Sequence, residues 1–265
     1  MFKTVEISDP RFAVEGLRWV TVHSAALAQR ADLTLWVPEG IAGRQAVPIV
    51  ILLHGVYGSH WAWAFKGGAH RTTAAMIRAG EIPPVILAMP SDGLCDHGSG
   101  YVPHQTQDFE RWIVEEVSAA THLAVPESSE ESPLCLTGLS MGGFGALRLG
   151  AKYPGRFRAV SAHSAATHQD QFKALMGDRL GPWSSREEDR SVLAAMRRNR
   201  EHLPPFRFDC GVDDFLLEPN RELHRELTAA GIAHGYEEHP GAHTWEYWER
   251  HLPDSLRFFA ARLAA

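Results

Sequence analysis

Five short runs of apolar residues recur along the chain, and they constrain its fold more than any other feature. In the first, VPIVILL at residues 47–53, no polar residue marks a solvent-facing side. Strands of this kind are buried on both faces, as in a parallel sheet covered by helices. The pattern therefore predicts an α/β fold with a mostly parallel central sheet. The runs are residues 47–53, 84–89, 134–137, 157–162 and 206–210.

Helical patterns fill most of the intervals between these runs. Residues 107–120, for example, would place Phe109, Trp112 and Val117 on one face of a helix. Because strands and helices alternate, we expect one α/β domain over residues 1–265, with helices flanking the sheet. Further helices are expected at residues 142–153, 219–230 and 244–263, the last despite Pro253.

Two parts of the chain fall outside this alternation. Residues 19–22 and 33–37 are predicted to be strands that pair as a hairpin at one edge of the sheet. Residues 165–201 contain Gly177 and Pro182 and end in a charged stretch, SREEDRSVLAAMRRNRE. We interpret residues 165–201 as an insertion that forms a small cap over the strand ends. The alternative is a solvated surface helix.

The composition excludes several classes of function. With a net charge of −6 and no basic tract, the chain is not expected to bind nucleic acid or an anionic membrane surface. It has no run of 18 apolar residues, so no membrane-spanning helix is expected. Acidic residues and a proline near Met1 differ from a signal peptide, and Cys95, Cys135 and Cys210 lack the spacing of a disulfide framework or zinc site. We therefore expect a cytoplasmic protein without metal or cofactor. The sequence is compatible with a homo-oligomer.

The third apolar run leads directly into GLSMG, which places Ser140 between Gly138 and Gly142. A strand before and a helix after this motif give the context of a nucleophile elbow, a strained turn that exposes a serine. Side chains two residues before and after the serine would collide in such a turn, and glycine removes them. Ser140 is therefore the candidate nucleophile. The alternative is a glycine-rich turn in which the serine caps a helix.

A serine hydroxyl needs a base within hydrogen-bond reach, and the base needs an acid to orient it. For the acid, Asp214 lies three residues beyond Gly211, on the loop that follows the run at 206–210. Asp213 remains the alternative acid, and Asp209 is expected to lie within the strand itself. For the base, the best candidate follows the last strand in the sequence PGAH, where the loop can bring His243 over the serine. The competing histidines are His234, His239 and His251.

An oxyanion hole needs two backbone N–H groups beside the serine. One is expected from Met141, the residue after Ser140, and the other from Val56 in the loop HGVYG. Three aromatic residues that follow this loop could line a substrate pocket or pack against the sheet: Tyr57, Trp61 and Trp63.

The loop SDGLCDHGSG and the start of the last helix also carry polar and aromatic residues that could lie near the site. Asp92, Asp96 and His97 lack the ligand pattern of a calcium loop, so we expect a turn-rich loop near the mouth of the active site. Nothing in the sequence indicates a reactive thiol at Cys95. Trp245, Tyr247 and Trp248 are expected to pack behind the His243 loop.

Five motifs occur in an order that resembles the "putative esterase" branch of the α/β-hydrolases, over residues 48–252. They are LLHGVYGSHWAW, AMPSDGLCDHGSGYV, GLSMGGFGAL, DCGVDDFLLEPN and PGAHTWEYW. That branch includes S-formylglutathione hydrolases, tributyrin esterases, feruloyl esterases and the antigen 85 mycolyltransferases. The resemblance implies an α/β-hydrolase fold with Ser140, Asp214 and His243 as a catalytic triad. It also implies Val56 and Met141 as oxyanion donors.

The expected function is a serine carboxylesterase that hydrolyses small acyl esters through an acyl-enzyme intermediate. An S-formylglutathione-type thioesterase is the runner-up, since the difference between the two lies in the shape of the pocket. An acyltransferase, in which an alcohol replaces water, is a third interpretation. A non-catalytic binding module is disfavoured because candidates for all three triad residues are present.

Overall fold

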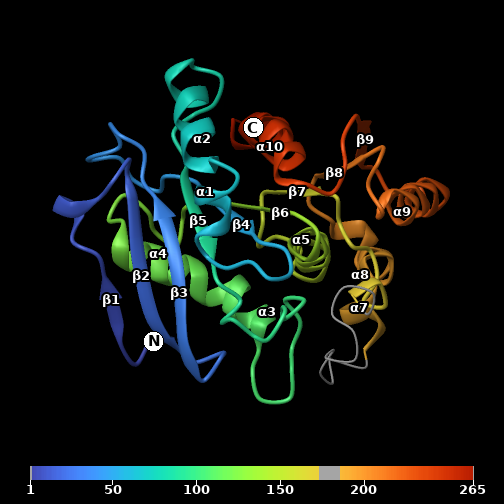
Figure 1. The fold of residues 1–265 in the computed structure, drawn as a ribbon, viewed down its shortest axis with the longest axis horizontal. Helices are drawn as coiled ribbons and strands as arrows, with labels where there is room; N and C mark the ends of the chain where they lie inside the picture. Colours follow the sequence, from blue (N-terminus) through green and yellow to red (C-terminus); the bar gives the residue numbers. More distant parts are fainter. Residues whose placement is uncertain (1, 173–185, 265) are drawn as a thin grey trace.

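A sheet of nine strands forms the centre of the protein within residues 2–172 and 186–264, which the computed structural model describes (Figure 1). Its strands are β1 (Val5–Ile7), β2 (Leu17–Ser24), β3 (Gln29–Trp36), β4 (Ile49–Leu53), β5 (Ile86–Pro90), β6 (Leu134–Gly138), β7 (Ala159–His163), β8 (Phe206–Gly211) and β9 (Gly235–His239). Their order in the sheet is β1-β2-β3-β5-β4-β6-β7-β8-β9. The six strands β5, β4, β6, β7, β8 and β9 run parallel to one another. The strands β1, β2 and β3 pair antiparallel, and β3 also pairs antiparallel with β5.

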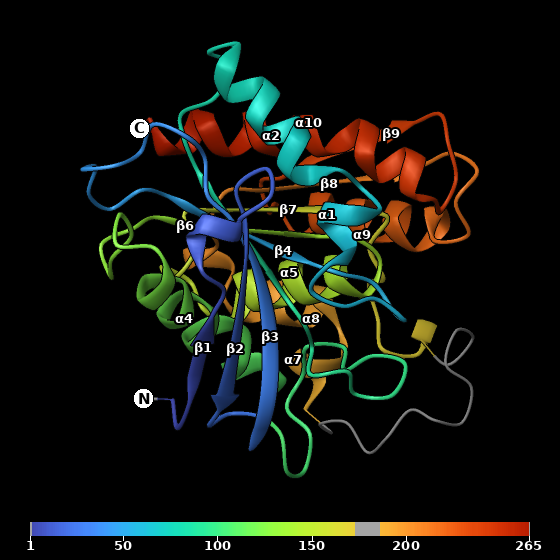
Figure 2. The same cartoon turned by 60° about the vertical axis from the view of Figure 1, so that its left-hand side comes forward.

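Helices cover both faces of the sheet. They are α1 (Ala62–Phe65), α2 (Ala69–Arg78), α3 (Phe109–Arg111), α4 (Val117–Ala124), α5 (Met141–Lys152), α7 (Glu187–Arg190), α8 (Val192–Arg198), α9 (Leu217–Ala229) and α10 (Trp245–Leu263). Figure 2 shows α2 and α10 on one side of the sheet and α4, α5 and α8 on the other. Short 3₁₀ turns lie at Pro10–Phe12 and Arg200–His202.

The strand β4 shows why the chain folds into three layers. Ile49, Ile51 and Leu53 belong to the apolar cluster on the α4 and α5 side. Val50 and Leu52, which point the other way, belong to the cluster on the α2 and α10 side. All five side chains are fully buried. Since burying such a side chain contributes about 1.5–3 kcal/mol, this one strand stabilises both halves of the core.

The predicted strands are confirmed, with one difference at the sheet edge. The hairpin predicted from residues 19–22 and 33–37 is formed by β2 and β3, but the short strand β1 pairs outside it through Val5 and Val22. The helix predicted at 107–120 is built from α3, a π-helical turn at Trp112–Glu116 and α4, so it continues to Ala124. The structure also contains α1 and α2, which the apolar pattern did not predict.

The described part of the predicted cap, residues 165–172 and 186–201, differs from both interpretations of it. Helix α8 buries Val192, Ala195 and Met196 in the core on the α5 side, so it is not a solvated helix. On α7, the buried carboxylate of Asp189 pairs with Arg148 and Lys152 of α5. These two helices therefore belong to the helical layer. The rest of the predicted cap, residues 173–185, lies outside the described residues.

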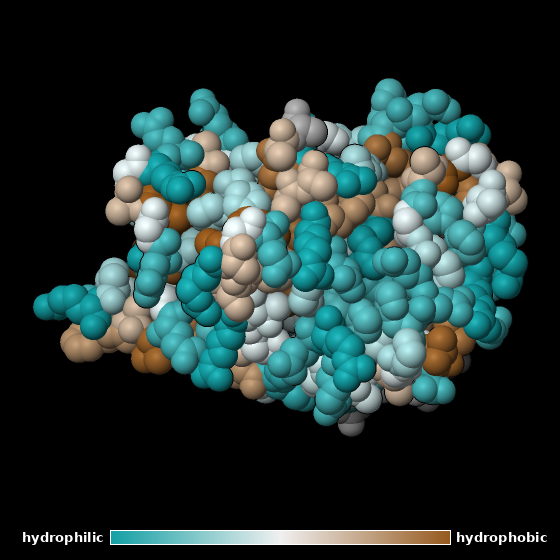
Figure 3. All heavy atoms as spheres, turned by 90° about the horizontal axis from the view of Figure 1, so that it is seen from above, coloured by the Kyte–Doolittle hydropathy of each residue, from teal (hydrophilic) through white to brown (hydrophobic). Residues whose placement is uncertain are grey.

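The face seen from above in Figure 3 is mostly hydrophilic, and hydrophobic residues appear on it in small groups. None of the helices in the part of the chain described is both long enough and apolar enough to cross a membrane.

Candidate active site

Ser140 stands at the turn between β6 and α5, with a backbone conformation that residues with side chains rarely adopt. Its φ is 55° and its ψ is −116°. Such a conformation costs about 1–3 kcal/mol and persists only where the surroundings fix it. Here the Ser140 N–H donates to the His163 carbonyl at 3.0 Å, and the Ser140 carbonyl accepts from the N–H groups of Phe144 and Ala166. The serine is thus held rigidly at the carboxyl end of a central strand.

Close backbone packing explains the two glycines of the motif. A Cβ atom at Gly142 would collide with the carbonyl oxygen of Leu53, and one at Gly138 would collide with the Gly142 backbone. Both obstacles are backbone atoms of the core and cannot move aside. The packing therefore requires glycine at these two positions of GLSMG, as the sequence predicts.

Three predicted residues form one chain of hydrogen bonds. The Nε2 atom of His243 lies 3.0 Å from Ser140 Oγ, and its Nδ1 atom lies 2.9 Å and 3.1 Å from the two carboxylate oxygens of Asp214. Since an ionised carboxylate only accepts, Nδ1 carries the proton and Nε2 is left to accept from the serine hydroxyl. The Asp214 side chain is fully buried, whereas that of His243 is 18% exposed. This arrangement can remove the hydroxyl proton as the serine attacks.

Two loops after neighbouring strands bring the acid and the base together. Gly211, at the end of β8, packs so closely against Gly241 that a Cβ atom on it would collide with the Gly241 carbonyl. The Asp213 N–H donates to that same carbonyl at 2.9 Å. Asp214 is fixed further, because its carboxylate accepts from the Leu216 N–H at 2.8 Å. The parallel pairing of β8 and β9 therefore places both loops at the same edge of the sheet.

The competing acids and bases lie elsewhere. Asp213 is exposed, and its backbone rather than its carboxylate holds the loop. His239 stacks on His251 with ring centroids 4.2 Å apart, and His234 bonds to His224. None of these side chains contacts Ser140.

Asp209 belongs to a second series of hydrogen bonds, which also joins a serine, a histidine and an aspartate but is wholly buried. Its carboxylate bonds to His163 Nδ1, and His163 Nε2 lies 2.8 Å from the hydroxyl of Ser255. Burial alone would raise the pKa of Asp209, but the neighbouring His163, Arg207 and Tyr247 outweigh it and lower that pKa to about 2. All three side chains of this chain are 0% exposed, so no substrate reaches them.

This buried network gives a prediction for stability against pH. The pKa of Asp209 is about 2 in the fold and near 3.8 when unperturbed. The ionised Asp209 side chain therefore stabilises the fold fully above pH 3.8, and this contribution is lost as the pH falls toward 2. Asp209→Asn should lower the free energy of unfolding at pH 7 by about 2 kcal/mol, and the difference from wild type should shrink below pH 4. Urea unfolding at pH 7, 5 and 3 measures this, and a difference that does not change with pH contradicts it.

Two backbone N–H groups lie beside the serine without a hydrogen-bond partner among the described residues. Neither the Val56 nor the Met141 N–H makes a hydrogen bond to any residue in the ranges described. The Val56 loop lies close to the serine, since a Cβ atom at Gly55 would lie 3.3 Å from Ser140 Cβ. The loop is fixed by the Tyr57 N–H, which donates to the His97 carbonyl at 2.8 Å. Unpaired donors of this kind can stabilise an oxyanion.

A hollow of 330 Å³ opens beside Ser140 and His243. Of the three predicted lining residues, Tyr57 and Trp61 line it and are 62% and 42% exposed. Trp63 does not, and its prediction as a pocket residue is wrong. It is 1% exposed, and its indole N–H donates to the Leu53 carbonyl at 2.9 Å. The short helix α1 turns this side chain into the core.

The start of α10 forms the opposite wall. Trp245 and Trp248 line the hollow, whereas Tyr247 packs behind the loop, 3% exposed, and donates to Asp209. The sequence placed these aromatic residues behind His243 but did not predict that two of them face the substrate side. Phe215 was not singled out either, and its ring centroid lies 4.6 Å from that of His243.

The loop of residues 91–100 was predicted to lie near the mouth of the active site, but none of its residues lines the hollow; it packs against the Tyr57 backbone and the Met141 side chain. The buried carboxylate of Asp92 accepts from the Ser99 N–H at 2.8 Å, and Gly98 packs directly against the Met141 side chain. Burial and the nearby carboxylates raise the pKa of the Cys95 thiol to about 11, so this cysteine is not activated.

One cluster of the described residues brings three side chains of metal-binding types together: His239, His251 and Asp254, with ligand atoms within 4.8 Å of one another. The two imidazole rings stack at an interplanar angle of 12°. Because a ring nitrogen binds a metal within the ring plane, nitrogens of stacked rings point alongside each other rather than toward one ion. The arrangement does not favour a metal site.

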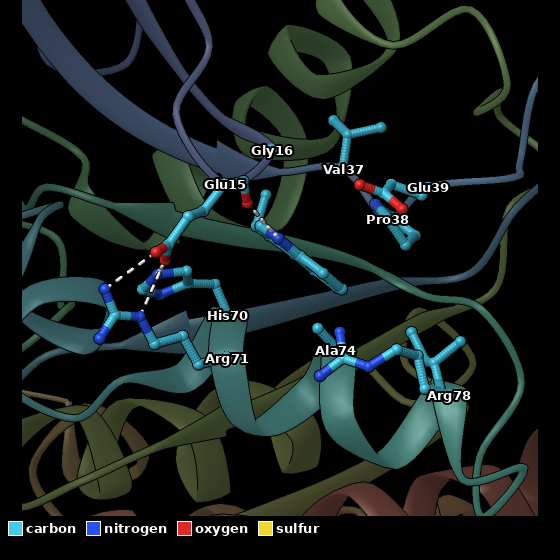
Figure 4. A pocket seen from close by; sticks show the side chains of 11 residues that line it. Glu15, Gly16, Val37, Pro38, Glu39, His70, Arg71, Ala74 and Arg78 are labelled. Atoms are coloured by element: carbon cyan, nitrogen blue, oxygen red, sulfur yellow. Dashed lines mark hydrogen bonds and ion pairs between the residues drawn. The ribbon is translucent and has the colours of Figure 1, made fainter.

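A second hollow, of 460 Å³, lies between the end of β3 and α2 (Figure 4). His70 and Arg71 face Glu15 there, and Arg71 pairs with it at 2.8 Å. Its lining contains no serine, threonine, cysteine or lysine. Of these two hollows, only the one beside His243 is lined by a serine, Ser140.

The chain is similar to known proteins both in sequence and in fold. A family model described as "Putative esterase" matches residues 24–259. The chain is 25% identical to an acetyl esterase of Caldicellulosiruptor saccharolyticus, over 79% of this chain and 82% of that protein. It is 26% identical to an S-formylglutathione hydrolase of Paracoccus denitrificans, over 94% of each chain. A solved structure of a ferulic acid esterase has a TM-score of 0.80 at 24% identity, covering 97% of this chain and 99% of that one.

The family match spans most of the chain and includes Ser140, Asp214 and His243. The structural match shows the same fold, an α/β sheet with a parallel centre and helices on both faces. The chain therefore belongs to the "Putative esterase" family, and it is a carboxylic ester hydrolase with an α/β-hydrolase fold.

Proposed function

We propose that the protein is a serine carboxylesterase that hydrolyses small acyl esters through an acyl-enzyme intermediate. Ser140 is the nucleophile, His243 is the general base and acid, and Asp214 orients the histidine as the third member of a catalytic triad. The observation that carries this proposal is the continuous hydrogen-bonded chain from Ser140 Oγ through His243 to the buried Asp214.

In the first step, Ser140 Oγ attacks the ester carbonyl while His243 Nε2 takes the hydroxyl proton. Asp214 stabilises the imidazolium that forms, and its burial keeps that interaction out of water. The N–H groups of Val56 and Met141 donate hydrogen bonds to the carbonyl oxygen as it becomes negatively charged. Because these donors have no other partner within the described ranges, they need no reorganisation as the charge develops.

His243 then protonates the leaving alcohol, and the acyl group stays on Ser140. A water molecule takes the place of the alcohol, and His243 Nε2 removes its proton as it attacks the acyl-enzyme. Collapse of the second tetrahedral intermediate releases the acid and restores the serine hydroxyl. Each proton moves through the one nitrogen that faces Ser140.

The size of the hollow supports a small substrate. Its volume of 330 Å³ lies at the lower end of the range for ligand pockets, about 300–1,000 Å³. We therefore expect acetyl and other short acyl esters to be turned over faster than long ones. A cytoplasmic location is part of the proposal, and the three free cysteines support it.

An S-formylglutathione-type thioesterase is the second candidate, favoured by the likeness to the Paracoccus denitrificans protein over nearly the whole chain. Turnover of 4-nitrophenyl acetate, tributyrin and S-formylglutathione by the same preparation separates the two. Higher kcat/KM for the simple esters supports the carboxylesterase. Dominant turnover of the glutathione thioester overturns it in favour of the second candidate.

The assignment of the acid gives a matched pair of variants. Asp214→Asn should lower kcat for 4-nitrophenyl acetate by about 10³- to 10⁴-fold, because an amide no longer holds the histidine in the productive tautomer. Asp213→Asn should change kcat by less than about twofold, since that side chain is exposed. Steady-state kinetics on both variants tests the assignment. A larger loss in Asp213→Asn would transfer the role to Asp213.

A further inference from the structure

Among the described residues that line the hollow at Ser140, Lys66 is the one with a permanent charge. The others are glycine, apolar, aromatic or hydroxyl residues, together with His243. Lys66 follows α1 directly and is exposed. A lone cation in an otherwise neutral wall is a candidate for recognising an anionic part of the substrate.

Within residues 2–172 and 186–264, the surroundings of Lys66 leave its charge unpaired. Its Nζ lies over the ring of Trp245, 5.4 Å from the ring centroid, which is a cation–π contact. Glu249, one turn further along α10, lines the neighbouring hollow with Lys66, yet no ion pair joins Lys66 to any carboxylate in the described ranges. The aromatic ring therefore orients the ammonium without neutralising it.

An aromatic wall connects this cation to the reacting serine. His243, which bonds to Ser140, has its ring centroid 5.0 Å from that of Trp248, and Trp248 lies 5.2 Å from Trp245. The buried indole N–H of Trp248 has no hydrogen-bond partner in the part of the chain described. The rings of Trp245 and Trp248 stand nearly perpendicular, at 87°, and the buried Trp248 N–H does not reach a substrate. The wall thus offers apolar ring surface and, at its far end, a cation that no carboxylate of the described residues pairs with.

We propose that this wall selects esters whose acyl or alcohol part carries a carboxylate at the end remote from the reacting carbonyl. The apolar part of such a substrate would lie along Trp248 and Trp245, and its carboxylate would pair with Lys66. This inference rests on the proposed function, because it takes Ser140 as the point from which the substrate extends. It concerns binding and not chemistry, so Lys66 is a specificity-determining residue.

The expected change in substrate affinity is small because Lys66 is exposed to water. A partly exposed ion pair changes affinity by about fivefold at most. Because the same pair forms in the ground state and the transition state, its loss should raise KM and leave kcat nearly unchanged. Salt should weaken the preference, because it screens exposed charges.

Two pairs of esters test the proposal from both sides of the reacting bond. On the alcohol side, 4-acetoxybenzoate is compared with the neutral 4-acetoxybenzamide. On the acyl side, 4-nitrophenyl hydrogen adipate is compared with the 4-nitrophenyl ester of adipic acid monoamide. The variant is Lys66→Gln, and the matched control is Lys3→Gln, which removes the same charge from an exposed position on a different part of the chain.

Wild type and Lys3→Gln should prefer the anionic member of at least one pair by about three- to fivefold in kcat/KM. Lys66→Gln should lose that preference through a raised KM for the anionic member, with a smaller change in kcat/KM for the neutral member, and Lys66→Arg should keep the preference. The proposal is overturned if neither pair shows a preference, or if the preference survives in Lys66→Gln. A failure of the proposed function is distinct, since it would appear as unchanged hydrolysis of the neutral esters by Ser140→Ala.

Discussion

Replacing Ser140 by alanine is expected to lower kcat/KM for 4-nitrophenyl acetate by about 10⁴-fold or more. Without the hydroxyl no acyl-enzyme can form, and only the N–H groups of Val56 and Met141 remain to stabilise an oxyanion on the substrate. The fold should not suffer, because Ser140 Oγ bonds only to His243 among the described residues. Steady-state kinetics on purified protein, with thermal unfolding as the check on folding, measures the effect.

The buried chain of Ser255, His163 and Asp209 provides the matched control. Its hydrogen bonds resemble those at Ser140, but the side chains are wholly buried. Ser255→Ala should therefore destabilise the fold and leave the activity of the folded enzyme within about threefold of wild type. Activity that survives in Ser140→Ala, or that is lost in folded Ser255→Ala, contradicts the assignment of the nucleophile.

His243→Ala should lower kcat on the order of 10³-fold or more, since a serine hydroxyl is a poor nucleophile at neutral pH without a base. The control is His239→Gln, because His239 lies at the end of β9 in the same segment but stacks on His251 instead of facing the serine. That variant should keep kcat within a few-fold of wild type. Rates of both variants are measured at pH 7 with saturating 4-nitrophenyl acetate. Near-normal activity of His243→Ala would rule out His243 as the base.

The two large effects should not add. Triad residues act as a unit, so the double variant Ser140→Ala/His243→Ala should be no slower than Ser140→Ala alone. A double variant that is slower by the product of the two single effects would mean that the two side chains act independently. That result would be incompatible with the 3.0 Å hydrogen bond between them being the functional contact.

The positions of Ser140, Asp214 and His243 could be predicted because backbone geometry leaves marks in the sequence. The glycines of GLSMG are required by collisions with the Leu53 carbonyl and the neighbouring backbone. The acid and the base each follow a predicted strand, and parallel strands end at the same edge of a sheet. Local spacing and strand direction together therefore brought three distant residues to one place.

The burial of the aromatic residues after the loop HGVYG could not be predicted in the same way. Trp61 and Trp63 are two residues apart and identical in type, yet one lines the hollow and the other is buried. Their difference arises from the short helix α1, which has only four residues and leaves too weak a periodic signal to predict. The burial of a single aromatic side chain therefore depends on a turn that the sequence does not mark.

The charged stretch after residue 185 misled the prediction in a different way. Arginines and acids surround VLAAM, and they hide the apolar spacing of Val192, Ala195 and Met196 that fits one face of a helix. In the structure this face packs against the α5 layer, and Asp189 pairs with the buried Arg148. A buried ion pair of this kind cannot be foreseen from charge patterning, because the partners lie 41 residues apart.

Covalent labelling tests the central claim most directly. A fluorophosphonate reacts with a serine only where a base activates the hydroxyl and N–H groups donate hydrogen bonds to the phosphoryl oxygen. Wild-type protein treated with the probe and digested should carry one adduct, on the peptide containing Ser140, and Ser140→Ala should carry none. An unlabelled wild type, or an adduct on another residue that persists in Ser140→Ala, would contradict the account.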